Sequence, residues 1–173
     1  MTNRIAFTLV LICIVVITAF SQPSRSLRIT VKDGSGVTRI LTIGVDPKGT
    51  YDFDPMFGEL PLPPPPPDWL FDARLLDPHG WKRYKHEGSA SDIRAFGSNK
   101  QIDTFYVRIQ TSQWPVTLTW DSSVRSWCDS LTVRNASVPF LIASVGAQQR
   151  VTLTGEKETS FLMVLHGPRI VSH

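Results

Sequence analysis

Hydrophobic and polar residues alternate with a period of two along most of the chain after residue 26. Leu27, Ile29 and Val31 are separated by polar residues, which is the pattern of a strand with one buried face. The turn-forming sequence Asp-Gly-Ser-Gly follows at residues 33–36, and a second strand-like run continues to residue 45. Residues 27–45 are therefore predicted to form a β-hairpin.

The same alternation returns in the second half of the chain, with turn residues between the segments. It predicts further strands at residues 71–76, near 93, and at 105–110, 116–120, 131–133, 139–144, 149–154 and 159–166. No segment keeps a 3.6-residue period, so the pattern predicts an all-β sandwich or barrel. We expect an antiparallel β-sandwich, immunoglobulin-like or jelly-roll-like. Val107, Leu118 and Trp120 lie on the apolar phase of their strands and should be in its core.

One acidic, proline-rich segment, residues 44–70, interrupts the alternation. Its residues Pro63–Pro67 cannot donate backbone hydrogen bonds and are held near the polyproline II conformation. The segment is therefore expected to cross from one sheet to the other as an ordered strap without regular secondary structure over the prolines. The apolar residues that flank the prolines are expected to pack down: Leu60, Leu62, Trp69 and Leu70. The alternative is a proline-rich ligand for a partner domain with an aromatic groove.

The first 21 residues have the layout of a secretory signal peptide. A basic start is followed by an apolar run from Ile5 to Phe20, and then by small residues at the positions that precede a cleavage site after Ser21. The run is shorter than the ~20 residues that span a bilayer, which argues against the alternative of an uncleaved anchor. We expect a bacterial protein that is secreted, periplasmic or on the cell surface. Residues 22–173 would form one domain without a membrane span.

The charge and the cysteine content of the chain exclude few functions. Loss of Arg4 with the signal peptide lowers the formal net charge from +3 to +2, and the basic residues cluster only at 82–85. A solvated loop explains that cluster better than a polyanion site, and secretion argues against nucleic acid as a partner. Cys13 would leave with the signal peptide, so Cys128 has no cysteine to pair with and is expected to pack as a small apolar residue.

The strap carries four acidic residues within fourteen positions: Asp46, Asp52, Asp54 and Glu59. Calcium takes several oxygen ligands, and loops can supply them, so these carboxylates are candidate calcium ligands. Their spacing does not match the helix–loop–helix calcium motif, and Asp-Pro pairs are also ordinary turn formers. The main expectation is therefore no metal and no cofactor, with calcium as the alternative.

The same region carries a resemblance to a known module. The matching residues are Gly44-Val45-Asp46-Pro47, Thr50, Asp54, Gly58-Glu59, the prolines, Phe71-Asp72-Ala73-Arg74, Asp92-Ile93-Arg94 and Pro115 to Trp120. Over residues 27 to 165 the chain resembles a module of secreted proteins from the Ignavibacteria–Bacteroidetes–Chlorobi group, which often precedes a type IX secretion sorting domain. The resemblance implies a β-sandwich without established catalytic residues. Because the chain stops at His173 without a sorting domain, we expect ordinary export to the periplasm or the medium.

Three function classes follow from these patterns. The first is a non-catalytic structural or interaction module of the cell envelope, with envelope or surface proteins as partners. The second is a carbohydrate-binding module, in which Trp81 and Trp114, both beside turns, would stack on a polysaccharide. The third is a hydrolase, with acid–base pairs drawn from the neighbouring groups Asp52, Asp54, Asp77, His79, His86 and Glu87. No catalytic motif supports the third class, so we expect that the protein is not an enzyme.

Overall fold

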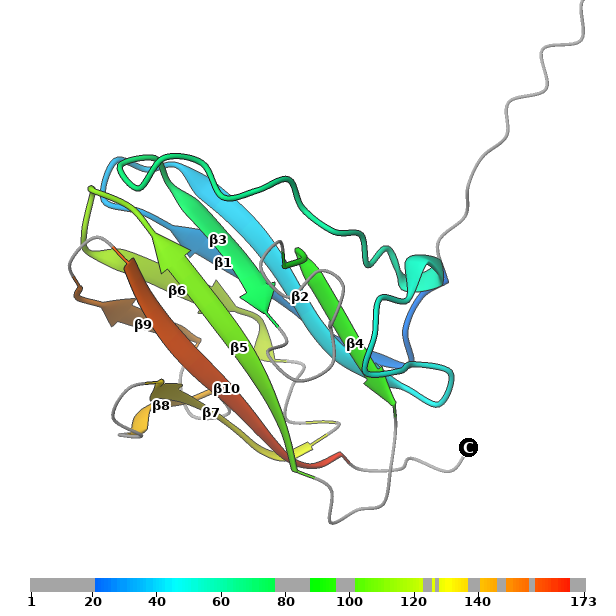
Figure 1. The fold of residues 1–173 in the computed structure, drawn as a ribbon. Coiled ribbons are helices and arrows are strands. Elements are labelled where there is room, and N and C mark those ends of the chain that lie inside the picture. The colour runs from blue at the N-terminus through cyan, green and yellow to red at the C-terminus, as the bar shows by residue number, and fades with distance from the viewer. Residues whose placement is uncertain are drawn as a thin grey trace, which may run out of the picture.

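Ten strands in the part of the chain that the structure describes form two facing sheets with the hydrophobic core between them (Figure 1). The structure is a computed structural model that describes residues 21–76, 88–95, 102–122, 126, 128–136, 141–145, 149–155 and 158–168. The strands are β1 Arg25–Lys32, β2 Thr38–Asp46, β3 Asp72–Leu76, β4 Ser91–Ala95, β5 Ile102–Gln110, β6 Val116–Trp120, β7 Cys128–Asn135, β8 Leu141–Ser144, β9 Arg150–Leu153 and β10 Glu158–Pro168. A short 3-10 helix, η1, spans Pro55–Phe57.

The strand order is β4-β2-β1-β6-β9 in the first sheet and β3-β5-β10-β7-β8 in the second. The predicted all-β sandwich is therefore confirmed. Neighbouring strands run antiparallel except β2 and β4, which pair in parallel with Thr42 opposite Ser91. A parallel pair requires a long crossover connection. The chain provides one, because it leaves β2, passes through β3 in the second sheet and then returns to the first sheet as β4.

The predicted hairpin is formed by β1 and β2, with Ile29 opposite Leu41. Its turn is organised by the Asp33 carboxylate, whose Oδ1 accepts hydrogen bonds from the backbone N–H groups of Ser35 (3.0 Å) and Val37 (2.9 Å). Gly36 adopts a left-handed conformation, with φ of 95°. Residues with side chains rarely adopt that conformation, which explains the glycine at this point of the turn.

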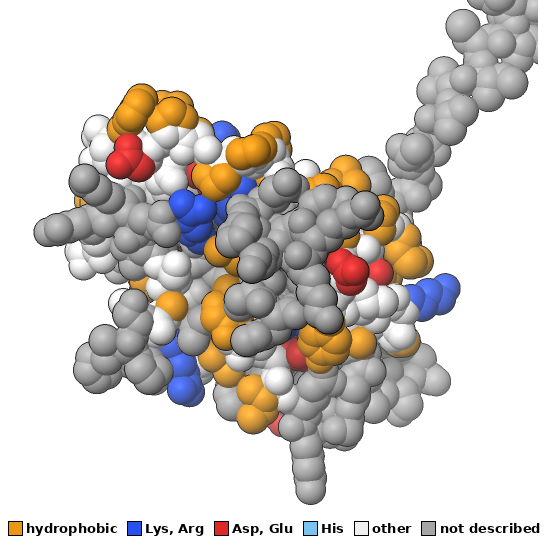
Figure 2. All heavy atoms as spheres, viewed as in Figure 1, with side chains coloured by type: hydrophobic (Ala, Val, Ile, Leu, Met, Phe, Trp, Pro, Cys, Tyr) orange, Lys and Arg blue, Asp and Glu red, His pale blue; other side chains and the backbone are white. Residues whose placement is uncertain are grey.

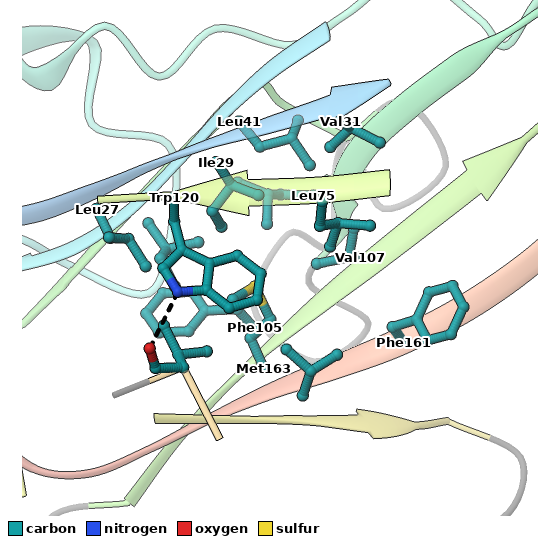
Figure 3. Close-up of a cluster of buried hydrophobic side chains, with 14 of the residues drawn as sticks. Leu27, Ile29, Val31, Leu41, Leu75, Phe105, Val107, Trp120, Phe161 and Met163 are labelled. Carbon is teal, nitrogen blue, oxygen red and sulfur yellow. Dashed lines mark hydrogen bonds between the residues drawn. The ribbon is translucent and has the colours of Figure 1, made fainter. Parts of the chain in front are cut away.

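The core is built from the apolar phases of strands in both sheets, as predicted. Figure 3 shows the Trp120 indole among side chains of β1, β5 and β10. Trp120 is 6 % exposed, and its Nε1–H donates a hydrogen bond to the Val145 carbonyl oxygen at 3.0 Å. Val107 and Leu118 are buried as well, which confirms all three predicted core residues. Cys128 is buried in the same cluster, as expected of a small apolar residue.

The strap joins the first sheet to the second, and the predicted crossover is confirmed. The prolines at 63–67 have no regular secondary structure, also as predicted. Its first residues, however, belong to β2, which extends to Asp46, so the irregular segment begins at Pro47. In Figure 1 the strap runs from the η1 end of the sandwich along one side to the opposite end, where β3 begins. No helix among the described residues is long and apolar enough to cross a membrane.

The prediction that all the apolar flanks of the prolines pack down was wrong. Leu60 is 53 % exposed, Trp69 64 % and Leu70 49 %, while Leu62 is half-buried. The buried apolar anchor of the strap is instead Phe57, in η1. Polar side chains hold this part of the strap through its backbone carbonyl groups.

Candidate functional site

The proline segment is held by its carbonyl oxygens, which remain available after the loss of the proline N–H groups. The Gln110 side chain, at the end of β5, donates from Nε2 toward the carbonyl oxygens of Pro66 (2.9 Å), Pro67 (2.9 Å) and Leu70 (3.3 Å). Arg74 Nη1 donates to the Pro63 carbonyl oxygen at 3.0 Å. These bonds fix the strap backbone around the prolines, and Trp69 and Leu70 next to them are exposed.

Three connections meet at the end of the sandwich where the strap enters β3. They are the β1–β2 turn, the end of the strap and the β5–β6 connection, and Figure 1 shows them gathered there. Gly34 N–H donates to the Gln113 carbonyl oxygen at 2.7 Å, and Ser112 Oγ donates to the Trp69 carbonyl oxygen at 3.0 Å. A Cβ atom on Gly34 would lie 2.9 Å from that Gln113 oxygen, so this close approach requires glycine. The three connections are thus bonded to one another.

Between them lies a groove of about 400 Å³, which we call the Trp69 groove. Its residues are Asp33, Ser35, Val37, Arg39, Pro66, Trp69, Leu70, Phe71, Ser112 and Gln113. Trp69, Leu70 and Val37 are large apolar residues that face solvent here. Figure 2 shows hydrophobic side chains gathered over this end of the molecule. Such a convergence of exposed apolar residues with polar ones at the rim is typical of a binding surface.

The polar residues of the groove fall into two groups. Asp33 is buried. Its Oδ1 accepts the hydrogen bonds of the β1–β2 turn, and its Oδ2 accepts a hydrogen bond from Thr111 Oγ1 at 3.3 Å. Asp33 therefore holds the groove together. Arg39 and Gln113 face solvent and have polar atoms without a hydrogen-bond partner among the described residues. These two side chains are able to contact a ligand.

Trp69, rather than Trp114, is the described tryptophan that lines the groove. Trp81 lies outside the described residues. Trp114 is half-buried against the core, and its buried Nε1–H has no hydrogen-bond partner in the described part of the chain. Trp69 was assigned to packing because it follows an apolar-flanked proline run. In the structure, Pro67 to Leu70 forms a turn, with Leu70 N–H donating to the Pro67 carbonyl oxygen at 2.9 Å, and turns place side chains outside.

The four acidic residues of the strap serve mainly as acceptors for nearby backbone groups. Asp46 accepts hydrogen bonds from Ser24 N–H (2.9 Å), Ser24 Oγ (2.7 Å) and Lys48 N–H (2.8 Å). Burial alone would raise its pKa, but the bonds from Lys48 and Ser24 outweigh burial and lower the pKa below its usual value. Asp52 Oδ1 accepts from the N–H of Phe53 at 2.8 Å. Asp52 therefore stabilises a local turn, while Asp46 stabilises the turn after β2 and also holds Ser24, which precedes β1.

Glu59 differs from these in the direction of its pKa shift and in its contact with β4. Its Oε2 accepts from Asp54 N–H at 2.9 Å, and its Oε1 accepts from the Ile93 N–H of β4. Asp54 Oδ2 in turn accepts from Thr50 N–H at 2.6 Å. Glu59 is 1 % exposed, and burial, with the negative charges of Asp92 and Asp54 as smaller causes, raises its pKa to about 8. The carboxyl group therefore ties the strap to the outer edge of the first sheet.

The structure gives the four carboxylates of the strap hydrogen-bonding roles within the protein. Among the described residues, no three Asp, Glu, His or Cys side chains are grouped so that they could hold a metal ion. These hydrogen bonds account for the acidic composition of the strap, since a segment of irregular turns leaves backbone N–H donors that need acceptors.

Two Asp-x-Arg sequences, both within the motifs of the resemblance, form buried ion pairs. On β3, Arg74 Nη2 donates to Asp72 Oδ1 at 2.9 Å, and on β4, Arg94 Nη2 donates to Asp92 Oδ2 at 2.9 Å. Residues two apart lie on the same face of a strand, which explains the spacing. The Arg94 guanidinium also lies 4.5 Å from the centre of the Phe105 ring. Because each charge is paired, these residues have a structural role.

The remaining sequence candidates lie outside the described residues. These are the hydrolase candidates Asp77, His79, His86 and Glu87 and the basic cluster Lys82, Arg83 and Lys85. The described candidates Asp52 and Asp54 both accept hydrogen bonds from neighbouring backbone groups.

Comparison with family models, with curated proteins and with solved structures found no match to this chain. The Trp69 groove is therefore the feature from which a function can be inferred. It combines exposed apolar surface, available polar groups and a backbone fixed by hydrogen bonds.

Proposed function

We propose that this protein is a secreted, non-catalytic β-sandwich that acts as an interaction module of the bacterial cell envelope or surface. The Trp69 groove would be its contact site. One observation carries the proposal: Trp69, Leu70 and Val37 are exposed side by side on a backbone that needs no rearrangement to present them. Tryptophan is among the residues that contribute most to binding at interfaces.

The energetics favour a binding role for these side chains. Full burial of a large apolar side chain contributes about 1.5–3 kcal/mol, and the Trp69 groove leaves several such side chains exposed in the isolated protein. The hydrogen bonds from Gly34 to Gln113 and from Ser112 to Trp69 hold the three connections in place before any partner arrives. Binding to a preformed site avoids the entropy cost of ordering loops. The groove is therefore suited to contact an external partner.

The alternative function of carbohydrate binding gains support from Trp69, which is exposed in the groove and is a candidate for stacking in addition to Trp81. The hydrolase alternative gains no support from the described residues. Asp52 and Asp54 are occupied by backbone donors there, and Asp33 in the groove holds the turn. We therefore propose that the protein binds its partner without chemical change.

The test measures binding of the purified mature protein to isolated bacterial cell envelopes by co-sedimentation. We expect the wild-type protein to sediment with the envelopes and Trp69→Ala to lose about tenfold in affinity. Leu60→Ala is the matched control, since Leu60 is also a largely exposed apolar residue of the strap but lies outside the groove. It should bind as the wild type does. Failure of the wild-type protein to sediment, or equal binding by Trp69→Ala, would overturn the proposal.

A further inference from the structure

We propose that the Trp69 groove is a saccharide-binding site, in which one sugar ring stacks on the Trp69 indole and its hydroxyl groups bond to Gln113 and Arg39. This inference rests on the proposed function, because it names the ligand class for the same groove. It follows from three features of the groove. They are an aromatic side chain on a fixed backbone, a hydrogen-bond donor and an acceptor that are available to a ligand, and a limited size.

The platform is rigid on both sides of the tryptophan. The Trp69 carbonyl oxygen accepts a hydrogen bond from Ser112 Oγ, and Leu70 is bonded at both its N–H and its carbonyl group. The preceding prolines restrict the backbone further. Trp69 as a whole remains 64 % exposed. One face of a sugar ring carries C–H groups and is apolar, so an exposed indole on a fixed backbone is a suitable surface for it.

The polar groups that a sugar needs lie in the same groove. The Gln113 side chain donates to Ser112 Oγ at 3.4 Å, which leaves its Oε1 as an acceptor. Arg39 donates only from Nη1, to the Thr38 carbonyl oxygen at 3.4 Å, among the described residues. Its remaining N–H groups are donors for ligand oxygens. A hydroxyl-rich ligand can use both kinds of group, whereas a purely apolar partner would leave them unpaired.

The size and the charge of the groove restrict the classes of ligand that fit it. A volume of about 400 Å³ is at the lower end of the range for small-molecule sites, which suits a few sugar rings better than a broad protein surface. The Asp33 carboxylate is enclosed by its own turn, so the Arg39 guanidinium is the charge that a ligand meets. Neutral sugars and uronic acids share the stacking chemistry. They differ in that a carboxylate would pair with Arg39.

The experiment titrates the mature protein with defined oligosaccharides at millimolar concentration, followed by calorimetry and tryptophan fluorescence. The probes are cellohexaose and chitohexaose as neutral ligands and hexagalacturonate as the acidic one. We expect at least one to bind, with about tenfold weaker binding for Trp69→Ala, a smaller loss for Trp69→Phe and no change for Leu60→Ala. If the natural ligand is acidic, Arg39→Ala should weaken the binding of hexagalacturonate more than the binding of the neutral oligosaccharides. Absence of binding by all three probes, or equal binding by Trp69→Ala, would overturn the inference.

A second measurement separates this inference from the proposed function. Cell envelopes are digested with protease before the co-sedimentation assay. Binding that survives digestion and depends on Trp69 supports a saccharide ligand. Binding that depends on Trp69 but is lost on digestion means that the partner is a protein, which contradicts the saccharide inference and leaves the interaction function intact. Binding that is independent of Trp69 contradicts both.

Discussion

Replacement of Glu59 by glutamine should remove most of the pH dependence of stability that this buried carboxyl group produces. Glu59 is enclosed between the strap and β4, where it accepts backbone hydrogen bonds from Asp54 and Ile93. The carboxylates of Asp92 and Asp54 are near enough to disfavour its ionised form, in addition to the larger effect of burial. Glutamine has a similar size and cannot ionise in this range. The substitution therefore isolates the effect of the charge.

The sign and size follow from the pKa. In the folded protein the Glu59 pKa is raised to about 8 from 4.5, so between these values the folded state binds a proton that the unfolded state has released. The associated stability is fully present below about pH 4.5 and is lost as the pH rises through about 8. The difference of about 3.5 pKa units, at 1.36 kcal/mol for each, corresponds to at most about 5 kcal/mol.

The assay is urea unfolding of the wild type and Glu59→Gln at about pH 5, 7 and 9, followed by tryptophan fluorescence. The variant loses one acceptor for a backbone N–H group, which lowers its stability equally at each pH. The difference in free energy of unfolding, wild type minus variant, should therefore fall by several kcal/mol as the pH rises. Histidines titrate in the same range, but their contribution is common to both proteins and cancels. A difference that stays constant across the three pH values would refute the account of Glu59.

Further predictions concern the core, the strap, the metal hypothesis and the N-terminus. Trp120→Ala should lower the free energy of unfolding by about 3–5 kcal/mol. Trp120→Phe should lower the free energy of unfolding by less, because the phenyl ring keeps most of the packing. The remaining loss comes from the Val145 carbonyl oxygen, which no longer has its donor. Gln110→Ala should speed proteolysis within the proline segment of the folded protein, because the segment loses a donor to its carbonyl groups. Melting curves in millimolar calcium and in chelator should coincide, and a higher melting temperature in calcium would restore the metal hypothesis. N-terminal sequencing of exported protein should begin at Gln22, and an intact Met1 in the membrane fraction would contradict the signal peptide.

The sequence was sufficient to predict features that depend on local periodicity. The alternation at Leu27, Ile29 and Val31 placed a strand and its buried face correctly, and Trp120 is in the core for the same reason. The crossover could also be predicted, because consecutive prolines cannot join a central sheet. The parallel pairing of β2 with β4 could not be predicted from the sequence. It depends on the path of the chain between these strands, which passes through β3 of the second sheet.

The candidate site was missed for a similar reason. An apolar residue beside a proline run gives no periodicity from which a buried or exposed side can be assigned, so Trp69 was expected to pack. Its exposure results from hydrogen bonds that Gln110 and Ser112 make with the strap, across some forty residues of sequence. The buried role of Glu59 likewise depends on its contact with Ile93 of β4. Neither contact has a signature in the local sequence.

The central claim is that the Trp69 groove is the contact site of this protein. The most direct test is NMR chemical-shift mapping of the isotope-labelled mature protein during titration with solubilised fragments of the bacterial cell envelope. The account predicts that the largest shifts occur at the Trp69 indole N–H and at the backbone N–H groups of Ser35 and Gln113, with Leu60 unchanged. Shifts that concentrate on another surface, or fragments that bind without moving the Trp69 signal, would contradict it.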